Sequence, residues 1–600
     1  MLGGYGGFGG RLSRRLSQAG HEVVVAGRRL SEAKRFCADV PGCRPLVADR
    51  GDDLTAIFAT ERPALVVDAA GPFQRSDYRV PRACAALNIP YLDLADDRAF
   101  VSGIGTIHAD VPIIAGASSV PALSGAAVRH LAAGMTRVTA IEAAISASNR
   151  AAAGRSVATA ILSSVGQPVP LWRGGRSVTG YGWQDMRREH FDLADGTSLG
   201  RRRVALADVP DLELLPERVA GHPAVMFRAG TELGFQNIAL WLASWPIRWF
   251  GGSLRPLARW LLPLQSLTAT LGSDRSGMVV RVFGVADGRR VERRWTLVAD
   301  KGDGPEIPTL AAAILAERIV AGACLPGPRD AGEELSLADF EPEFSRLAIR
   351  HETREIVQPE PLYRRVMGGE FDRLRPAVRT LHDVLRDGGA SGRATVIRGR
   401  HPVARLIAAT FGFPPAGEQA LHVSFSERDG EEIWTRDFAG RRFRSRMTQR
   451  RQQLVEQFGP LRFRFALLRE GGDLSMVMRG WSCFGVALPS ALAPRAAARE
   501  TEDAQGRFSF DVAIALPLIG LIVHYQGWLA PSNGPGGVSL SPDLRHVQVP
   551  DAPACRRTTN IATMGGGPEW LSFGSKHGAS CGSGECECPL SPNCGHWSIV

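Results

Sequence analysis

Lysine is scarce in this chain: it occurs only at Lys34, Lys301 and Lys576, and the rest of the 71 basic residues are arginine. The arginines are scattered, and no basic stretch is interleaved with the aromatic residues that a groove for single-stranded nucleic acid needs. The formal net charge of +10 is therefore not interpreted as evidence of nucleic-acid binding. No nucleic-acid partner is expected.

A secretory leader is not visible at the N-terminus. The first residues are glycine-rich, whereas a signal peptide has a basic patch followed by an apolar run. A cytoplasmic location is therefore expected. A chain of 600 residues is too long for one hydrophobic core, and it predicts three or four structural units.

The paired cysteines of a structural zinc site are also missing. Half of the ten cysteines lie after about residue 531, where the spacing Cys581-x4-Cys586-x-Cys588-x5-Cys594 lacks two-residue knuckles. No metal is expected. Residues 531–600 are rich in glycine, proline, serine and cysteine, and this composition predicts a disordered tail.

Glycine, by contrast, is concentrated at the start of the chain. Gly4-x-Gly6-x-x-Gly9 has the spacing of a dinucleotide-binding loop: one glycine for a tight turn, one for close approach to a pyrophosphate, and one for helix packing. The following segment, residues 11–19, is compatible with a helix whose first N–H groups would face the phosphates.

The residues after the next predicted strand indicate which nucleotide this loop prefers. A site for NAD usually has an acidic residue there to bind the ribose 2′-hydroxyl, but this chain has Ala26-Gly27-Arg28-Arg29. Two arginines favour a 2′-phosphate, so NADP is predicted as the cofactor. The alternative is that Arg28 and Arg29 only solvate the start of a helix.

The stretch before the glycines is short. A Rossmann first strand needs about five residues, and only Met1 and Leu2 precede Gly3. Either the start of the chain is assigned too late, or the sheet has lost its central strand.

Short β-branched runs then alternate with helix-compatible segments. The predicted strands are 21–26, 45–49, 64–68, 90–94 and 111–115. This alternation predicts an α/β fold, a Rossmann-like doubly wound parallel sheet, over residues 1–120. Residues 121–353 are predicted to form a second, α+β domain for substrate or dimerisation. Period-two runs in residues 362–530 predict a β-rich antiparallel domain with one apolar face, able to close around an apolar ligand.

Several short motifs resemble those of the saccharopine dehydrogenase or saccharopine reductase-like NAD(P)-binding family. They are Gly-Gly-Tyr-Gly-x-Phe-Gly at 3–9, Ala-Gly-Arg at 26–28, Ala-Ala-Gly-Pro-Phe at 69–73, Tyr-Leu-Asp-Leu-Ala-Asp at 91–96 and Gly-Ala-Ser-Ser-Val-Pro at 116–121. The resemblance covers about the first 130 residues well and extends more loosely to about residue 350. Residues from about 360 to 530 resemble an uncharacterised bacterial domain.

The family resemblance implies a set of cofactor contacts. The pyrophosphate would be held by Gly4, Tyr5, Gly6, Gly7, Phe8 and Gly9. Arg28 and Arg29 would hold the 2′-phosphate, and Asp49 would lie near the adenine edge. The nicotinamide side would be flanked by Ala70, Gly71, Pro72 and Phe73. This chain lacks an evident Lys/His pair for acid–base work on an imine.

Catalytic candidates lie at the carboxyl ends of the predicted strands 90–94 and 111–115. Asp93 and Asp96 are at the end of the first of these and Ser118 follows the second, at the sheet edge where a substrate binds. The alternative is that these residues, with Asp97 and Ser119, only cap the helices that follow.

A tryptophan-rich segment lies within the second unit. Leu233–Leu271 carries Trp241, Trp245 and Trp249 four residues apart, and arginine and proline interrupt it before a membrane span is complete. It is interpreted as a lid over an apolar substrate or as an interfacial helix at the inner face of the membrane. A subunit interface in a homodimer, or an ordinary core stripe, is the alternative.

Together these features predict an NADP-dependent oxidoreductase that transfers a hydride to or from a small or lipid-like substrate. A different hypothesis is a catalytically inactive nucleotide-binding or scaffold protein, since the first strand is short and no acid stands out.

Overall fold

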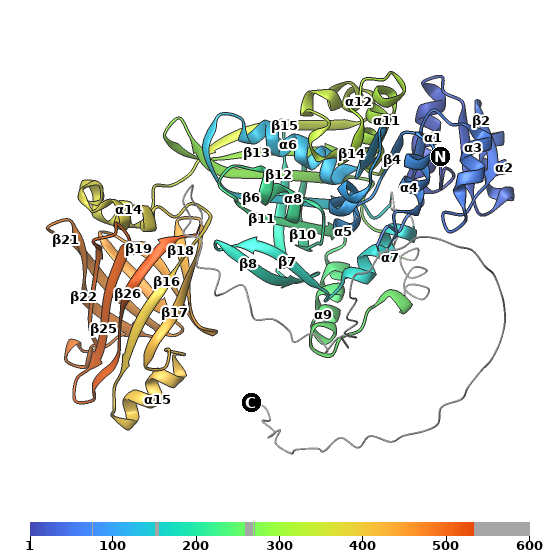
Figure 1. Cartoon of the computed structure of the whole chain (residues 1–600). Coiled ribbons are helices and arrows are strands. Elements are labelled where there is room, and N and C mark those ends of the chain that lie inside the picture. The colour runs from blue at the N-terminus through green and yellow to red at the C-terminus, as the bar shows by residue number, and fades with distance from the viewer. Residues whose placement is uncertain (75, 151–154, 258–267, 269, 533–600) are drawn as a thin grey trace, which may run out of the picture. The chain divides into compact units, whose positions relative to one another are not determined.

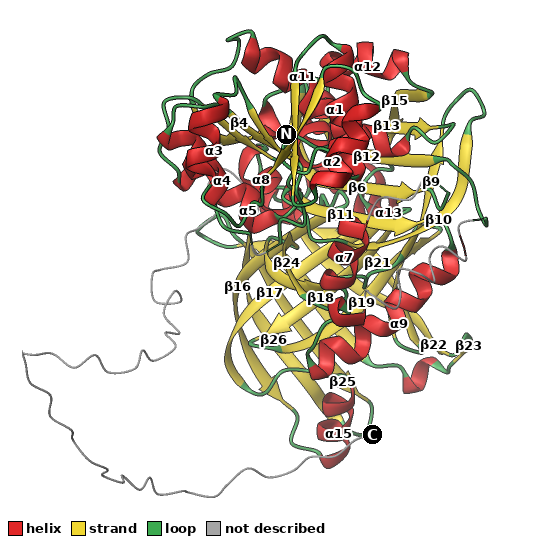
Figure 2. Ribbon diagram, turned by 90° about the vertical axis from the view of Figure 1, so that its right-hand side faces the viewer, coloured by secondary structure: helices red, strands yellow, loops and turns green. Residues whose placement is uncertain are grey.

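The computed structural model describes residues 1–74, 76–150, 155–257, 268 and 270–532. The described residues all belong to one compact unit. Figure 2 shows that helices are concentrated around the N-terminal strands, whereas the C-terminal domain is almost entirely strand. The tail predicted to be disordered falls, from residue 533 onward, outside the described residues.

The N-terminal part alternates parallel strands with helices (Figure 1). Its elements are α1 (Gly7–Gln18), β1 (Val23–Gly27), α2 (Leu30–Ala38), β2 (Cys43–Val47), α3 (Leu54–Glu61), β3 (Val66–Asp68), α4 (Arg79–Ala86), β4 (Tyr91–Asp93), α5 (Arg98–Ser102) and β5 (Pro112–Ala115). The β-branched runs form these strands because both faces are covered, as in parallel sheets generally. The expectation of parallel strands alternating with helices is confirmed.

These strands form two parallel sheets rather than one. β1 pairs with β2, and the other sheet has the order β14-β5-β4-β3, where β14 is Gly327–Asp330. Leu2 lies between the two sheets, because it forms parallel bridges to Ala26 at one side and to Asp68 at the other. The backbone of Leu2 therefore joins β1 to β3, and the glycine loop starts at this junction.

The second part is built on a seven-stranded mixed sheet with the order β15-β13-β12-β6-β11-β10-β9. Only the β6–β11 pair is parallel. The strands are β6 (Met135–Ala147), β9 (Arg187–Asp192), β10 (Ser198–Leu206), β11 (Ala224–Thr231), β12 (Ser276–Ala286), β13 (Arg289–Ala299) and β15 (Ile349–Val357), with a separate hairpin of β7 (Pro168–Arg173) and β8 (Arg176–Tyr181). The helices are α6 (Ser124–Ala132), α7 (Arg155–Ser164), α8 (Asp211–Arg218), α9 (Gly234–Phe250), α11 (Ile307–Val320) and α12 (Glu341–Arg346).

The two α/β parts share one hydrophobic core. Leu12 and Val25 belong to the same cluster of buried side chains as Val280 and Trp295. β14 also comes from the second part and pairs in parallel with β5. Burial of this size stabilises both parts together, at about 25 cal/mol per Å² of apolar surface removed from water. The glycine loop is thereby held beside the seven-stranded sheet.

The C-terminal domain is a closed antiparallel barrel of ten strands, in which β21 pairs with β22 to complete the circle. The strands are β16 (Asp387–Arg398), β17 (Gly417–Arg428), β18 (Glu431–Phe438), β19 (Arg441–Arg450), β20 (Gln453–Phe458), β21 (Leu461–Glu470), β22 (Asp473–Cys483), β24 (Arg495–Glu502), β25 (Phe508–Leu516) and β26 (Gly520–Pro531), with a short β23 (Val486–Ala487). The helices are α13 (Leu362–Met367), α14 (Pro376–His382) and α15 (Pro402–Thr410). The predicted antiparallel sheet with one apolar face is confirmed.

The segment between the seven-stranded sheet and the barrel has two local features. Residues 362–382 are divided into α13 and α14 because Gly368 has a φ of +60° and Pro376 starts a new helix. β15 continues to Val357 because it pairs with β13 along its whole length. The prolines stop the strand only after this point.

Candidate functional site

The glycine loop folds back closely on the first turn of α1. Gly3 has a φ of +68°, and a Cβ atom at Gly9 would lie 2.2 Å from the carbonyl oxygen of Gly3. No side chain fits at either position. The Ser13 hydroxyl donates a 2.9 Å hydrogen bond to the carbonyl oxygen of Gly4 and holds the loop from the helix side.

The N-terminus of α1 is left open by the residues around it. Gly6 is the N-cap, no side chain caps the helix, and its first turn contains no acidic residue. Free N–H groups and the positive end of the helix dipole favour an anion here. Gly6, Gly7 and Phe8 line a large cavity, so this end of the helix faces open space.

Tyr5 connects the loop to the end of β1. The backbone N–H of Arg29 donates to the Tyr5 hydroxyl over 3.1 Å. The ring of Tyr5 covers Gly27 so closely that a Cβ atom there would lie 2.4 Å from the ring. Position 27 therefore has no room for a side chain while Tyr5 occupies this place.

The two arginines that follow are open to solvent. The Arg28 side chain is 79% exposed, and its Nε lies 4.0 Å from Oδ2 of Asp49. Arg29 is exposed beside it. An exposed ion pair of this length contributes little to stability, so the guanidinium groups stay available to another anion. The structure thus brings Arg28, Arg29 and Asp49 together at the carboxyl ends of β1 and β2.

The turn after β3 is fixed by a buried ion pair. Oδ1 of Asp68 accepts from the backbone N–H of Ala70 over 2.9 Å, and Oδ2 lies 3.0 Å from Nε of Arg50. Burial raises the pKa of Asp68, although the Arg50 guanidinium opposes this shift. Arg50 also lies 4.7 Å above the ring of Phe73. It therefore holds the turn that contains Gly71 and Pro72 at the cavity wall.

Of the acidic residues after β4, Asp96 is the one that opens into the cavity without a helix to cap. Oδ1 of Asp96 accepts a long, 3.4 Å hydrogen bond from Gln74, and burial within the cavity walls raises its pKa. Asp97 also lines the cavity, but it accepts from the N–H of Phe100 and caps α5.

Asp93 lies beneath the cavity rather than at its surface. Its side chain is fully buried, and Oδ1 accepts from the backbone N–H groups of Gly116 at 2.7 Å and Ala95 at 2.9 Å. Burial raises the pKa of Asp93 to about 7. Because it joins the turn after β4 to the turn after β5, Asp93 positions Asp96 relative to Ser118.

Ser118 lies at the cavity wall with Ser119. It precedes a short helical segment, residues 119–123, but its side chain makes no capping hydrogen bond. The capping alternative considered for Ser118 is therefore not observed in this structure. Its hydroxyl is placed to contact a molecule in the cavity.

The cavity has a volume of about 1030 Å³ and extends across both α/β parts. At one end it contacts Gly6–Phe8 and Gly71–Phe73. At the other end its wall is largely apolar, with Ile145, Phe227 and Met278 from the seven-stranded sheet and Ile161 from α7. Among the described residues, neither a lysine nor a histidine lines it. A cavity of this size and character suits a ligand with a long apolar portion.

Seven predicted cofactor residues and one predicted catalytic residue do not line this cavity: Gly4, Tyr5, Gly9, Arg28, Arg29, Asp49, Ala70 and Asp93. Gly4, Gly9 and Ala70 support its wall from behind, Tyr5 covers Gly27, and Asp93 is buried below. Sequence patterns missed Arg50 and Asp208. Asp208 lines the cavity and pairs with Arg98 over 2.6 Å. Neither residue belongs to a motif, and only the tertiary contacts place them at the site.

Helix α9 continues through Pro246, and residues on either side of the helix, such as Thr231 and Gly252, line the cavity. Its Trp241, Trp245 and Trp249 rings lie 6.1 and 5.6 Å apart along one face, as their spacing predicts. Trp249 and Phe250 are exposed, whereas Ile247 packs on the buried Trp183. None of the helices in the described ranges is long and apolar enough to cross a membrane. The interfacial-helix, lid and subunit-interface interpretations all stay predictions, and residues 258–267 lie outside the described residues.

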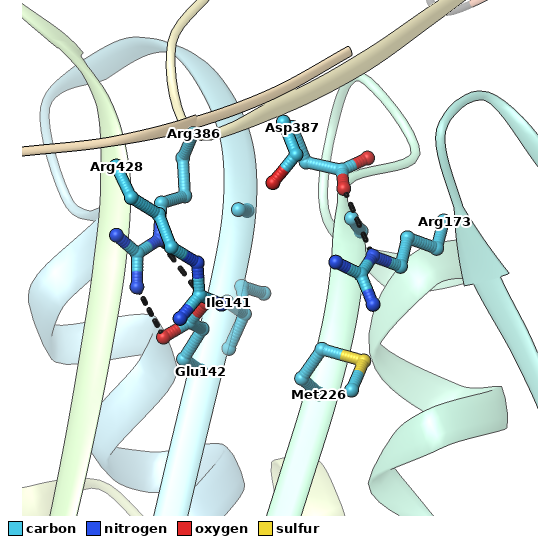
Figure 3. A pocket seen from close by; sticks show the side chains of 10 residues that line it. Ile141, Glu142, Arg173, Met226, Arg386, Asp387 and Arg428 are labelled. Atoms are coloured by element: carbon cyan, nitrogen blue, oxygen red, sulfur yellow. Dashed lines mark hydrogen bonds and ion pairs between the residues drawn. The ribbon is translucent and has the colours of Figure 1, made fainter. Parts of the chain in front are cut away.

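A second cluster of charges joins β6 to the barrel (Figure 3). Glu142 accepts from Arg386 at 3.1 and 2.7 Å and from Arg428 at 3.5 Å, and Asp387 lies 3.5 Å from Arg173. Burial alone would raise the pKa of Glu142, but Arg386 and its neighbours lower it to about 2. The space between these residues measures only about 10 Å³. We interpret the cluster as an ion-pair network that attaches the barrel.

Two histidines on strands of the barrel have polar partners. His422 lies 2.8 Å from the carbonyl oxygen of Gly174, and burial lowers its pKa to about 4. His524 pairs with Asp511. A buried histidine that the sequence did not indicate is His382 of α14, which lies 2.6 Å from Glu500. The described residues contain no group of three or more His, Cys, Asp or Glu side chains arranged to hold a metal ion.

The comparisons with known proteins concern the barrel. Residues 374–529 match the model of a family described as a domain of unknown function (DUF4166). This range extends from the start of α14 into β26, so the predicted uncharacterised domain at about 362–530 is confirmed. A comparison with curated proteins found no match to the chain. The resemblance of the N-terminal half to saccharopine dehydrogenase-like proteins stays a prediction.

Proposed function

We propose that the chain is an NADP-dependent oxidoreductase of the saccharopine dehydrogenase-like type, with a Rossmann-like nucleotide domain and a lipid-like substrate. One observation carries the proposal: a single cavity reaches from the open N-terminus of α1, past Gly71–Phe73, to the apolar wall of the seven-stranded sheet. This geometry suits a ligand pair in which the nucleotide occupies one end and an apolar substrate the other.

The residues at the nucleotide end fit the proposed cofactor. The glycines leave a cradle that a Cβ atom would fill, and the helix N-terminus carries no competing carboxylate. The N–H groups of Gly7 and Phe8 would bind the pyrophosphate, because the N–H of Gly6 already donates to the carbonyl oxygen of Gly3 over 2.9 Å. Arg28 and Arg29 would bind the 2′-phosphate. Bound NADPH would supply the hydride.

The residues at the substrate end can move a proton. Asp96 opens into the cavity, and desolvation raises its pKa, which is the direction that a proton donor needs. The Ser118 hydroxyl would hydrogen-bond the reacting group. Asp93 and Arg50 are positioning residues, since they act through the two turns that carry Asp96 and Phe73.

A catalytically inactive nucleotide-binding or scaffold protein is the second candidate. It is favoured by the lack of a lysine or histidine among the described residues of the cavity wall. The two functions differ in turnover, not in nucleotide binding.

NADPH consumption with defined substrates tests the oxidoreductase proposal. We expect the absorbance of NADPH to fall in the presence of a long-chain enoyl thioester, and to fall more slowly with imino acids. The Asp96→Asn variant should have a kcat about 100-fold lower than the wild type. The NADPH affinity of this variant should stay unchanged, because Asp96 is predicted to contact the substrate. Tight NADPH binding without turnover of either substrate class would instead support the scaffold function.

A further inference from the structure

One end of the barrel concentrates its exposed apolar side chains. Successive strands are antiparallel, so the connections β16–β17, β18–β19, β20–β21, β22–β24 and β25–β26 all lie at the same end, which we call the distal rim. In Figure 1 this end carries α15, and α14 lies at the other. Every large apolar side chain of the barrel domain, among the described residues, that is more than 40% exposed belongs to the rim: Ile397, Val403, Leu406, Phe484, Val486, Leu492 and Leu518.

Two of these side chains stand at the tips of loops in a costly backbone conformation. Phe484 has a φ of +47° and is 86% exposed, and Leu518 has a φ of +69° and is 101% exposed. Positive φ values favour glycine and asparagine, and a bulky side chain adopts them only with strain. At such positions the solvent exposure of the apolar side chain and the positive φ of the backbone each cost free energy. A contact outside the barrel would offset both costs.

The charge of the rim has one sign. Residues 398–417, 438–442, 458–462, 483–495 and 516–520 contain no aspartate or glutamate, but they contain seven arginines: 398, 400, 405, 441, 442, 462 and 495. Two acidic residues directly adjoin these stretches: Glu418 pairs with Arg393 at 3.3 Å, and Asp437 pairs with Arg442 at 2.8 Å. Within the described part of the chain, no carboxylate forms an ion pair with Arg400, Arg405 or Arg441. These guanidinium groups remain available to phosphates.

The opposite end of the barrel has a different character. Its connections carry acidic residues, among them Asp429, Glu470 and Asp503, and Asp473 is paired with Arg375 just before α14. The helices α13 and α14 contact the strands there. This end also carries arginines, such as Arg428, Arg450 and Arg451, so its charge is mixed, and an anionic surface would be attracted more strongly to the distal rim.

We propose that the distal rim binds an anionic lipid bilayer, with Phe484 and Leu518 inserted at the headgroup boundary and the arginines on lipid phosphates. A bilayer fits better than a protein, because apolar tips on separate loops surrounded by cations match a surface that is apolar below and anionic above. It also fits better than nucleic acid, since Leu518, Leu406 and Val486 offer no ring on which a base would stack. This inference does not depend on the nucleotide site.

Vesicle flotation of the full chain tests the proposal. We expect binding to phosphatidylcholine vesicles that contain about one third phosphatidylglycerol, and at least about tenfold weaker binding to phosphatidylcholine alone. The double variant Phe484→Ser with Leu518→Ser should lose at least about tenfold in partitioning, and Arg405→Gln with Arg441→Gln a similar amount. Both pairs are exposed, so the thermal unfolding midpoint should stay unchanged.

Two control variants test whether vesicle binding is specific to the distal rim. Ile433→Ser with Leu468→Ser removes exposed apolar groups from the opposite end of the barrel and should leave vesicle binding unchanged. Trp249→Ser with Phe250→Ser removes the exposed end of α9 and should also leave it unchanged. Loss of binding only in the α9 variant, or no binding to anionic vesicles, would overturn the proposal. A wild-type dimer that the Phe484 and Leu518 variant dissociates in sedimentation without vesicles would overturn it as well.

Discussion

Gly9→Ala is expected to weaken NADPH binding by about 100-fold or more, close to the cost of losing two charge-assisted hydrogen bonds. A Cβ atom at this position would lie 2.2 Å from the carbonyl oxygen of Gly3 and 2.9 Å from its carbon, and neither backbone atom can give way unless the loop moves. The N–H groups of Gly7 and Phe8 would then no longer converge on a pyrophosphate. Isothermal titration with NADPH measures the change.

Gly105→Ala is the matched control for this substitution. Nothing lies within 4 Å of a Cβ atom at Gly105, and its φ is not positive, so alanine should leave both NADPH affinity and the thermal midpoint unchanged. Gly6→Ala gives an intermediate case, since its only close contact is the Gly3 oxygen at 3.0 Å. Wild-type affinity in a folded Gly9→Ala protein would contradict the proposed role of the loop.

The double variant Arg28→Ala with Arg29→Ala is expected to remove the preference for NADPH over NADH. Hydrogen bonds to charged groups contribute about 1.5–3 kcal/mol each, and solvent exposure of the two guanidinium groups reduces this contribution. Together they should account for about 2–2.7 kcal/mol, or about 30- to 100-fold in affinity for NADPH. The affinity for NADH should change by less than about threefold, because NADH has no 2′-phosphate. Competition of the two nucleotides in a fluorescence titration measures this ratio.

Arg35→Ala is the control for the loss of positive charge. Its side chain is 76% exposed and lies one turn further along α2, where it pairs with Glu32. This variant should retain the wild-type preference, since it changes the charge of the same helix without touching the predicted phosphate contact. If Arg35→Ala and the double variant behaved alike, general electrostatics rather than specific contacts would explain the preference.

Local patterns predicted the parts of the fold that local physics determines. The β-branched runs at 23–27 and 66–68 form buried parallel strands, and the glycine spacing gives a tight loop before a helix. The antiparallel C-terminal strands were also evident from their period of two. The sequence did not determine that the barrel closes. Closure depends on the pairing of β21 with β22, and the pattern within one strand does not specify which strand it pairs with.

The candidate site was predicted less completely than the fold. Gly6, Gly71 and Ser118 could be placed at the cavity because they follow strands or open a helix. Arg50 could not, because its contact with Asp68 depends on how two turns pack. Asp208 is brought to the cavity by the second part of the chain and by Arg98, so no motif marks it.

Titration of the wild-type protein with NADPH and with NADH tests the central claim most directly. Both would use the amide cradle of Gly7 and Phe8, but only NADPH carries the group that Arg28 and Arg29 are predicted to hold. We predict saturable binding of NADPH that is at least about tenfold tighter than binding of NADH. Absence of binding by either nucleotide would contradict the account.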